Sequence, residues 1–286
     1  MQLDHAVINT RYNLDAAEQR FEALGFQLTA RGYHSLGSTN HLMMFGTDYL
    51  ELIGLPEPLP GSDQPRVTRA GVSDAPVGIN GLVFKTDDAE ATFAHLQALG
   101  MAGEPPKSFS RPVDLHDGEA PREASFTTVH VRPDCFPAGR VYFCQHHTPE
   151  LVWRPAWQRH ANGSTRIAAL LLVSTEPERE AEQFAKLMAG SARAVGAGEF
   201  SVAATDFCLD VVSPAQYQQR FGDYASPTQA RNSFFGALRI AVDDPAKVMR
   251  FADKLPASTW SKTSASSVVV REASFDTLLE FVAPHP

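Results

Sequence analysis

Short apolar runs bounded by turn residues alternate with amphipathic stretches over the first part of the chain. Residues 3–8 form one such run with His5 inside it, and residues 47–54 form another with Glu51 inside it. Both are short and rich in residues that suit a pleated surface, so we predict two strands. Strand side chains alternate between faces, so a histidine and a glutamate can face one space. A neutral imidazole and a carboxylate make half of a site for a hard or borderline metal ion.

A helix is predicted between these two strands, at residues 14–25. Its apolar residues recur at helical spacing, and Gly25 follows them as a stop signal. Residues 26–29 are predicted to be extended, and another strand is predicted at 41–45, just before the strand that carries Glu51. The order is therefore strand, helix, strand, strand, strand.

The same order recurs three times along the chain. New strands are predicted from residues 78, 166 and 235, and amphipathic helices at 88–100, 178–188 and around 248–255. Recurrence at a spacing of this kind indicates a repeat architecture. The predicted fold class is α+β, built from four βαβββ units.

Two proline-rich stretches interrupt the first half, at residues 54–78 and 103–121. Proline excludes a helix interior or a central strand, so both are predicted to be long irregular segments that roof a pocket. A third irregular stretch, residues 146–165, separates the second unit from the third. We expect a first domain at 1–155 and a second at 164–286.

Composition narrows the class of protein. The chain has 286 residues and a formal charge of −8, with no cluster of lysine or arginine, which argues against a nucleic-acid partner. Three scattered cysteines indicate a reducing compartment. No signal peptide is visible, and the longest apolar run, 167–173, is too short to span a bilayer. We expect a cytoplasmic protein with a small-molecule partner and no membrane contact; a homodimer stays open.

The chain resembles the vicinal-oxygen-chelate superfamily in its repeated units, in the first strand, Leu-Asp-His-Ala-Val, and in the later strand, Tyr-Leu-Glu-Leu-Ile. That superfamily includes glyoxalase I, extradiol dioxygenases and the bleomycin-resistance proteins. The residues from His34 to His41 point to its glyoxalase-like branch. The resemblance implies two halves of paired units, each a curved mixed sheet with helices on its convex face. It also implies a divalent metal on the concave face, held by the first and fourth strands of each unit.

Residue by residue, the resemblance assigns His5, Glu51 and His146 as metal ligands, with Gln145 as the alternative to His146. The matching position on the first strand of the second unit falls on Asn80 or Gly81, and neither is a good ligand. In the second half Glu280 matches Glu51, but it has no histidine partner. The second pair of units is therefore expected to be structural.

An open divalent ion can chelate adjacent oxygens and stabilise an enediolate or an alkoxide. We therefore expect a metal-dependent lyase, isomerase or dioxygenase acting on a small oxygen-rich metabolite. Glu51 and His34 are the candidate catalytic residues, although His34 lies in a glycine-containing turn where it can also bond to backbone. The ion is Zn, Mn, Ni, Co or Fe, because ligand type selects only weakly among them. The alternative function is a metal-free protein that binds or sequesters a small molecule.

Overall fold

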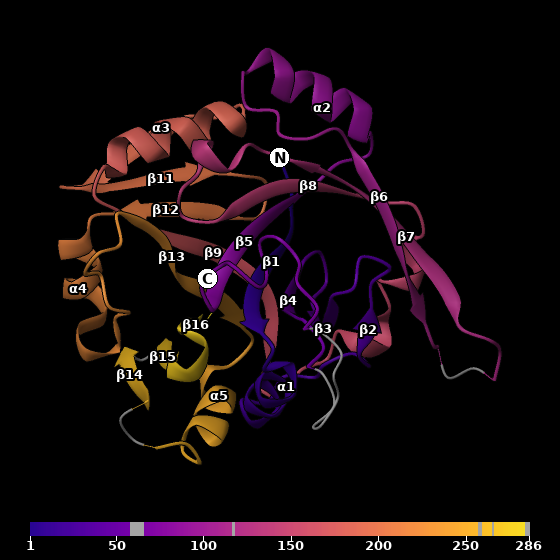
Figure 1. Ribbon diagram of the computed structural model, residues 1–286. Helices are drawn as coiled ribbons and strands as arrows, with labels where there is room; N and C mark the ends of the chain where they lie inside the picture. Colours follow the sequence, from indigo (N-terminus) through magenta and orange to yellow (C-terminus); the bar gives the residue numbers. More distant parts are fainter. Residues whose placement is uncertain (58–65, 116–117, 257–258, 265, 284–286) are drawn as a thin grey trace.

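The computed structural model describes residues 1–57, 66–115, 118–256, 259–264 and 266–283. Two eight-stranded mixed sheets make up the chain, one from each half (Figure 1). The strands of the first sheet are β1 (Leu3–Arg11), β2 (Gly32–Tyr33), β3 (Thr39–Met44), β4 (Tyr49–Gly54), β5 (Gly78–Lys85), β6 (Lys107–Val113), β7 (Arg122–His130) and β8 (Arg140–His146). Those of the second are β9 (Ser164–Ser174), β10 (Ala192–Gly196), β11 (Glu199–Ala203), β12 (Cys208–Val212), β13 (Ser233–Val242), β14 (Trp260–Ser264), β15 (Ser267–Glu272) and β16 (Thr277–Val282).

The two sheets have the same topology. In the first, β1 runs parallel to β4 and antiparallel to β5, and β5 runs parallel to β8. The spatial order β2-β3-β4-β1-β5-β8-β7-β6 is repeated as β10-β11-β12-β9-β13-β16-β15-β14. First strands of paired units thus meet at the centre of each sheet, with the fourth strands beside them. The predicted α+β fold of four βαβββ units in two halves is confirmed.

One helix of each unit covers the same face of its sheet. These helices are α1 (Leu14–Ala23), α2 (Ala89–Ala98), α3 (Pro177–Leu187) and α5 (Pro245–Ala252). In α1 the predicted stripe is buried at Leu14, Ala17 and Phe21, and Gly25 follows with a positive φ of 82°. The apolar side chains of all four helices belong to a single core that runs through both halves. The side chains at alternate positions along the strands point away from this core, toward the opposite face of each sheet.

An additional helix departs from the predicted arrangement. Helix α4 (Pro214–Phe221) lies between β12 and β13 and packs on the face of the second sheet that α3 and α5 leave uncovered. Its Tyr217 is completely buried and donates a hydrogen bond of 2.9 Å to the carbonyl of Gly236. The cup of the second sheet is therefore filled by the protein's own side chains.

The stretch 103–121 is more regular than we predicted, because it contains strand β6. Pro112 lies inside this strand, and the missing N–H is tolerated since β6 is the last strand of the sheet. Residues 116–117 of this stretch, and 58–65 of the stretch 54–78, lie outside the described residues. The described parts of 54–78 beyond β4 form no helix or strand before β5, in line with the prediction.

The stretch between the two sheets is tied to the first half. His160 accepts a hydrogen bond from the backbone N–H of Gln27 at 3.0 Å and donates one to the carbonyl of Met44 at 2.9 Å. Asn162 is fully buried and donates to the carbonyl of Leu24. The end of this stretch is therefore a buried connection between the two halves. In the described ranges, no helix has the length and apolar character needed to cross a membrane.

Candidate functional site

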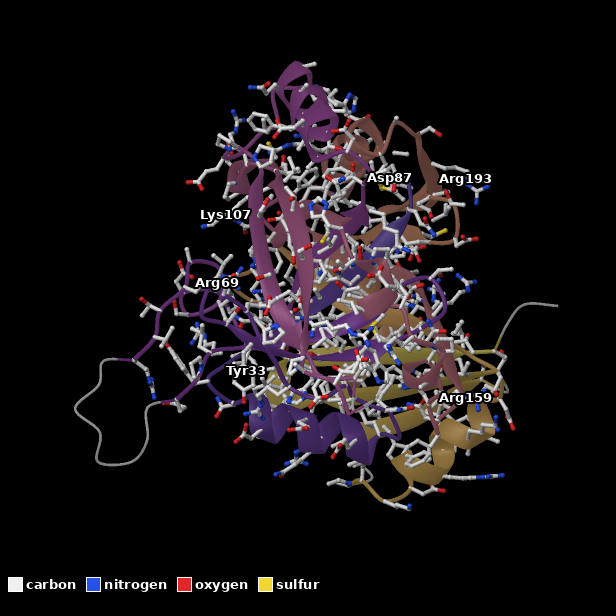
Figure 2. All side chains as sticks on the ribbon, turned by 90° about the vertical axis from the view of Figure 1, so that its right-hand side faces the viewer. Tyr33, Arg69, Asp87, Lys107, Arg159 and Arg193 are labelled. Carbon is white, nitrogen blue, oxygen red and sulfur yellow. The ribbon has the colours of Figure 1, made fainter. Side chains whose placement is uncertain are left out.

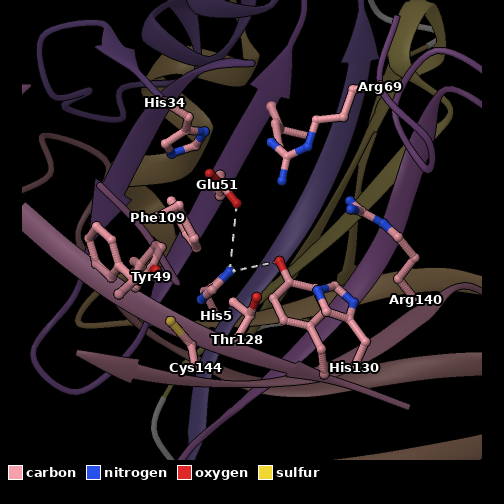
Figure 3. Close-up of a pocket in the computed structure, with 13 residues that line it drawn as sticks. His5, His34, Tyr49, Glu51, Arg69, Phe109, Thr128, His130, Arg140 and Cys144 are labelled. Carbon is pink, nitrogen blue, oxygen red and sulfur yellow. Dashed lines mark hydrogen bonds and ion pairs between the residues drawn. The ribbon is translucent and has the colours of Figure 1, made fainter. Parts of the chain in front are cut away.

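A cavity opens on the face of the first sheet opposite to its helices (Figure 3). It has a cavity volume of about 50 Å³ and lies between side chains of β1, β4, β7 and β8, with further walls from β6 and from the loop before β5. The lining combines charged and aromatic residues: His5, His34, Tyr49, Glu51, Ile53, Arg69, Phe109, Phe126, Thr128, His130, Arg140, Tyr142 and Cys144. We refer to this cavity as the N-terminal cup.

His5 and Glu51 meet inside the cup, as the alternation of their strands predicts. Parallel pairing sets His5 opposite Tyr49 and Val7 opposite Glu51, so the two side chains lie on one face, diagonally across neighbouring strands. His5 Nε2 lies 3.6 Å from Glu51 Oε2, and the imidazole stacks on the Tyr49 ring with centroids 4.3 Å apart. Both residues are nearly inaccessible to solvent, so the pair is a rigid feature of the sheet.

Glu51 stays ionised despite its burial. Burial alone would raise its pKa, but the electrostatic influence of the neighbouring His5 and His34 and a hydrogen bond from Asn40 hold the pKa below its usual value. Asn40 Nδ2 donates to Glu51 Oε1 at 2.7 Å, leaving Oε2 to face His5. The site therefore presents a fixed carboxylate to the cup.

His34 is part of the support of Glu51. Its Nε2 lies 3.2 Å from Asn40 Nδ2 and its Nδ1 lies 2.8 Å from Ser38 Oγ. Burial lowers the pKa of His34 to about 4, with Arg111 and Arg69 acting in the same direction against the charge of Glu51. A neutral imidazole then accepts from Asn40 and donates to Ser38. His34 lines the cup, but both ring nitrogens are engaged, an arrangement that suits positioning Glu51.

His146 is not brought to the His5–Glu51 pair. Its Nε2 binds the carboxylate of Asp4 at 2.8 Å, and Asp4 also lies 3.3 Å from His5 Nδ1. Burial alone would raise the pKa of Asp4, but the charge and hydrogen bond of His146, together with His5, hold it well below its usual range. A buried chain thus runs from His146 through Asp4 to His5.

Tyr142 occupies the place that was assigned to His146. In the first unit, Glu51 of β4 lies opposite Val7 of β1 in the parallel strand pair. In the second unit, Tyr142 of β8 lies opposite Val83 of β5 in the same way. The Tyr142 hydroxyl lies 3.3 Å from His5 Nε2, whereas His146 comes four residues later, at the end of β8. The prediction placed this fourth-strand position on Gln145 or His146 at the end of β8, whereas the strand register puts Tyr142 there.

The other assigned positions of the second unit hold no ligand in the cup. Gln145 Oε1 accepts from the N–H of Ala89 and its Nε2 donates to the carbonyl of Asp87, so it lies at the start of α2. Asn80 lies close to the carbonyl of Gly71 and to Arg140. Gly81 has no side chain, and a Cβ there would come 2.8 Å from Val7. Neither Asn80 nor Gly81 therefore offers a metal ligand to the cup, in line with the expectation that this first-strand position is a poor ligand site.

Two arginines form the opposite wall of the cup. Arg140 begins β8, and Arg69 comes from the loop between β4 and β5, beside β6 and β7 (Figure 2). His130 lies between this wall and Tyr142, on whose ring it stacks with centroids 4.7 Å apart. Burial lowers the pKa of His130 to about 4, and the charges of Arg140 and Arg69 act in the same direction. This end of the cup is thus cationic without any contribution from histidine.

A second group of possible ligands lies beside the pair. Ligand atoms of Asp4, Cys144 and His146 lie within 4.8 Å of one another. Burial raises the pKa of the Cys144 thiol well above its usual value, and the charges of Asp4 and Glu51 act in the same direction. A protonated thiol is a poor ligand, and Asp4 is already bonded to two histidines. This group is less suited to a metal than the His5–Glu51 pair.

The corresponding place in the second sheet is closed by ion pairs. Glu280 on β16 is bound by Arg239 at 3.0 Å and by Arg220 at 2.7 Å, and Asp210 lies 3.3 Å from Arg239. Burial alone would lower the pKa of Arg239, but the charges of Glu280 and Asp210 raise it. Together with α4 in the second cup, these pairs favour the structural role that was predicted for this half.

Several site residues were missed from the sequence, namely Asp4, Arg69, Arg140, Tyr142 and His130. The alternation Arg-Val-Tyr-Phe-Cys over residues 140–144 was a usable signal, because it puts Arg140, Tyr142 and Cys144 on one face. Arg69 carried no such signal, since it lies in an irregular loop. The two predicted roofing stretches do reach the cup, through Arg69 and through Phe109 of β6.

Comparisons with known proteins agree with this architecture. Residues 3–188 match the family model described as a glyoxalase-like domain, a match that continues past the predicted domain boundary into the second half. A search of curated protein sequences finds no match.

Solved structures share the fold at low identity. A hypothetical protein from Staphylococcus aureus has a TM-score of 0.66 and 12% identity, covering 99% of both chains. A mutant of 4-hydroxymandelate synthase from Streptomyces coelicolor has a TM-score of 0.56 and 14% identity over 99% of this chain and 92% of the other. A fusion of a xylose isomerase-like TIM barrel with 4-hydroxyphenylpyruvate dioxygenase has a TM-score of 0.58 and 11% identity over 99% and 49%.

The family match spans well over half of the chain and covers the whole first sheet with its cup. The paired βαβββ units and the placement of His5 and Glu51 on first and fourth strands agree with it. The chain belongs to the glyoxalase-like domain family, within the vicinal-oxygen-chelate superfamily.

Proposed function

We propose that the protein is an enzyme of the vicinal-oxygen-chelate type that acts on a small oxygen-rich molecule in the N-terminal cup, with a divalent cation held by His5 and Glu51. The observation that carries the proposal is the separation of 3.6 Å between His5 Nε2 and Glu51 Oε2. This distance is too long for a hydrogen bond and compatible with two ligands of one ion, which each bind at about 2.0–2.2 Å.

The chemistry of the donor atoms supports this assignment. Asp4 lies at His5 Nδ1, which favours the tautomer whose Nε2 lone pair faces the cup. A carboxylate on the outer nitrogen of a ligating histidine is the usual support of metal sites. Glu51 supplies a charged oxygen. The Tyr142 hydroxyl is a weak third donor, because burial raises its pKa well above its usual value.

The protein supplies few ligands to the ion, and this determines which chemistry the site can support. Among the described residues, His5 and Glu51 are the two strong protein donors that face the ion site, so most coordination positions are open to water and substrate. A divalent ion there would polarise a carbonyl or bind two adjacent oxygens of the substrate. Glu51 Oε2, ionised and facing the cup, is the candidate proton acceptor, and Asn40 with His34 holds its orientation. The reaction class that fits is a lyase, isomerase or dioxygenase, and the ion is Zn, Mn, Ni, Co or Fe.

A second function is favoured by Gly81, which contributes no ligand where the partner unit would supply one. In that case the cup binds or sequesters a small molecule without metal, and Arg69 and Arg140 hold it by charge. Metal binding separates the two candidates.

The test is a calorimetric titration of metal-free protein with Zn²⁺, Mn²⁺, Ni²⁺, Co²⁺ and Fe²⁺. We expect at least one ion to bind the wild type, and Glu51→Gln to weaken it by more than the roughly 10–100-fold that loss of a supporting residue costs. Glu22→Gln, an exposed carboxamide substitution on α1, is the matched control and should bind like the wild type. If no ion binds the wild type more tightly than Glu51→Gln, the metal proposal fails and the metal-free function replaces it.

A further inference from the structure

We propose that the ligand of the N-terminal cup carries an anionic group, a carboxylate or a phosphate, that binds between Arg69 and Arg140. The inference rests on the proposed function only in taking this cup as the ligand site, and it does not require the metal. It assigns a chemical class of ligand and two specificity residues.

The first argument is the charge balance of the cup. Arg69 and Arg140 line it, and Glu51 is the lining residue with a carboxylate. Within the described part of the chain, neither arginine has a carboxylate oxygen within ion-pair distance. Burial lowers the pKa of Arg69, and the nearby charge of Arg140 acts in the same direction, against the influence of Tyr142 and Glu51. Two half-buried cations that face one space, with no ion pair to a described carboxylate and one carboxylate in the lining, favour an anion between them.

The second argument is that the donors of Arg140 are open. Its Nε is buried and has no hydrogen-bond partner among the residues that the structure describes, and its Nη2 lies 3.5 Å from Asn80 Oδ1, at the limit for a hydrogen bond. Gly71 packs against the side chain: a Cβ there would lie 2.8 Å from Arg140 Cδ. Arg140 is thus held by packing while the Nε–H of its guanidinium remains without a described partner.

The third argument is that Arg69 is positioned in advance. Its loop is anchored to the end of β1, where Asn9 Nδ2 donates to the carbonyl of Val72 at 2.9 Å and Arg11 Nε donates to that of Ala75 at 2.8 Å. Arg69 itself donates to Ser38 Oγ. A guanidinium fixed in this way loses little freedom when it binds an anion.

Together these features divide the cup into two ends. The guanidinium groups of Arg69 and Arg140 offer forked N–H donors that suit carboxylate and phosphate oxygens. Glu51 repels an anionic group and keeps it at the arginine end (Figure 3). The rest of the ligand then extends toward His5 and Glu51, where the reacting oxygens would lie.

The experiment measures binding of matched small ligands by NMR titration. Glycolate and glycolamide have the same shape and differ in charge, and inorganic phosphate represents the other anion class. The protein is freed of metal on a chelating resin, because soluble chelators are themselves polycarboxylates. We expect glycolate or phosphate to bind and glycolamide not to bind. The tighter anion identifies the class of the natural ligand.

Arg69→Gln and Arg140→Gln should each weaken anion binding by at least about tenfold, since both remove a charged donor. Arg20→Gln, on the exposed face of α1, is the control and should have no effect. Thermal melting of each variant verifies folding. Equal binding of glycolate and glycolamide, no binding by any ligand, or unchanged binding in both cup variants would overturn the inference.

Glu51→Gln separates this inference from the proposed function. If the anion binds the arginines, removing the repelling carboxylate leaves its affinity unchanged or raises it. A fall in anion affinity in Glu51→Gln would place the anion at the His5–Glu51 pair and overturn the inference. A failure of the metal titration leaves these results unaffected, because they are obtained without metal.

Discussion

Asp4 determines how His5 faces the cup. It is completely buried, lies at His5 Nδ1 and is bound on its other side by His146. His5 and Glu51 could be proposed from two short strands, because alternation and the resemblance both select them. Asp4 could not be proposed from the sequence, because strand alternation puts it on the face opposite to His5. Only the folded sheet shows that its carboxylate reaches both His5 and His146.

The series of hydrogen-bonded residues from His146 through Asp4 to His5 predicts how strongly substitutions at these positions weaken metal binding. Asp4→Asn should weaken metal binding by roughly 10–100-fold, because His5 loses the group that orients it. His146→Gln should weaken it less, since His146 acts only through Asp4, and Cys144→Ser should leave it unchanged. Calorimetry on the three variants checks the order. A loss of binding in His146→Gln and Cys144→Ser as large as in Glu51→Gln would instead assign the metal to the Asp4, Cys144 and His146 group.

At the scale of elements, the two sheets differ in what occupies their cups. The first is open to solvent and lined by charged groups, and the second holds α4 with the ring of Tyr217. The four repeats could be predicted because each has its own apolar stripe. Helix α4 was missed, since it interrupts the repeat, and its role depends on Gly236, which is distant in sequence from the residues it contacts.

Gly236→Ala tests how tightly the second cup is filled. An added Cβ would come 2.6 Å from Val173 and 2.9 Å from the Tyr217 ring, both buried, so we expect a loss of about 1–3 kcal/mol in the free energy of unfolding. Denaturant unfolding measures it. Gly190→Ala, whose nearest neighbour would be 3.8 Å away, is the control. An unchanged stability in Gly236→Ala would show that this cup has room that the structure does not indicate.

At the scale of the whole molecule, a buried carboxylate joins the halves. Asp48, in the turn before β4, accepts a hydrogen bond of 2.8 Å from the N–H of Ile167 on β9. Burial raises its pKa from 3.8 to about 6, against the hydrogen bonds from Ile167 and Thr47. Between the pKa of the unfolded chain and that of the folded protein, Asp48 therefore keeps a proton in the folded state that it has lost in the unfolded chain. This contribution to stability declines as the pH rises from about 4 to about 6.

Asp48→Asn should remove this dependence, since a carboxamide accepts from Ile167 and donates to Thr47 without a charge. We expect the variant to equal the wild type near pH 4 and to be more stable near pH 7 by roughly 2–3 kcal/mol. Unfolding free energies across this range, with Glu22→Gln as an exposed control, check the difference. A variant that is less stable than the wild type near pH 7 would contradict the burial of an unpaired charge at Asp48.

The central claim is that the N-terminal cup, and not the second half, holds the ion. Crystals soaked with Zn²⁺ and measured at its absorption edge test this most directly, because anomalous scattering locates the metal itself. The account predicts a peak within about 2.0–2.2 Å of His5 Nε2 and Glu51 Oε2 in the wild type and its absence in Glu51→Gln. A peak at Asp4, Cys144 and His146, a peak at Glu280 in the second half, or no peak in the cup would contradict it.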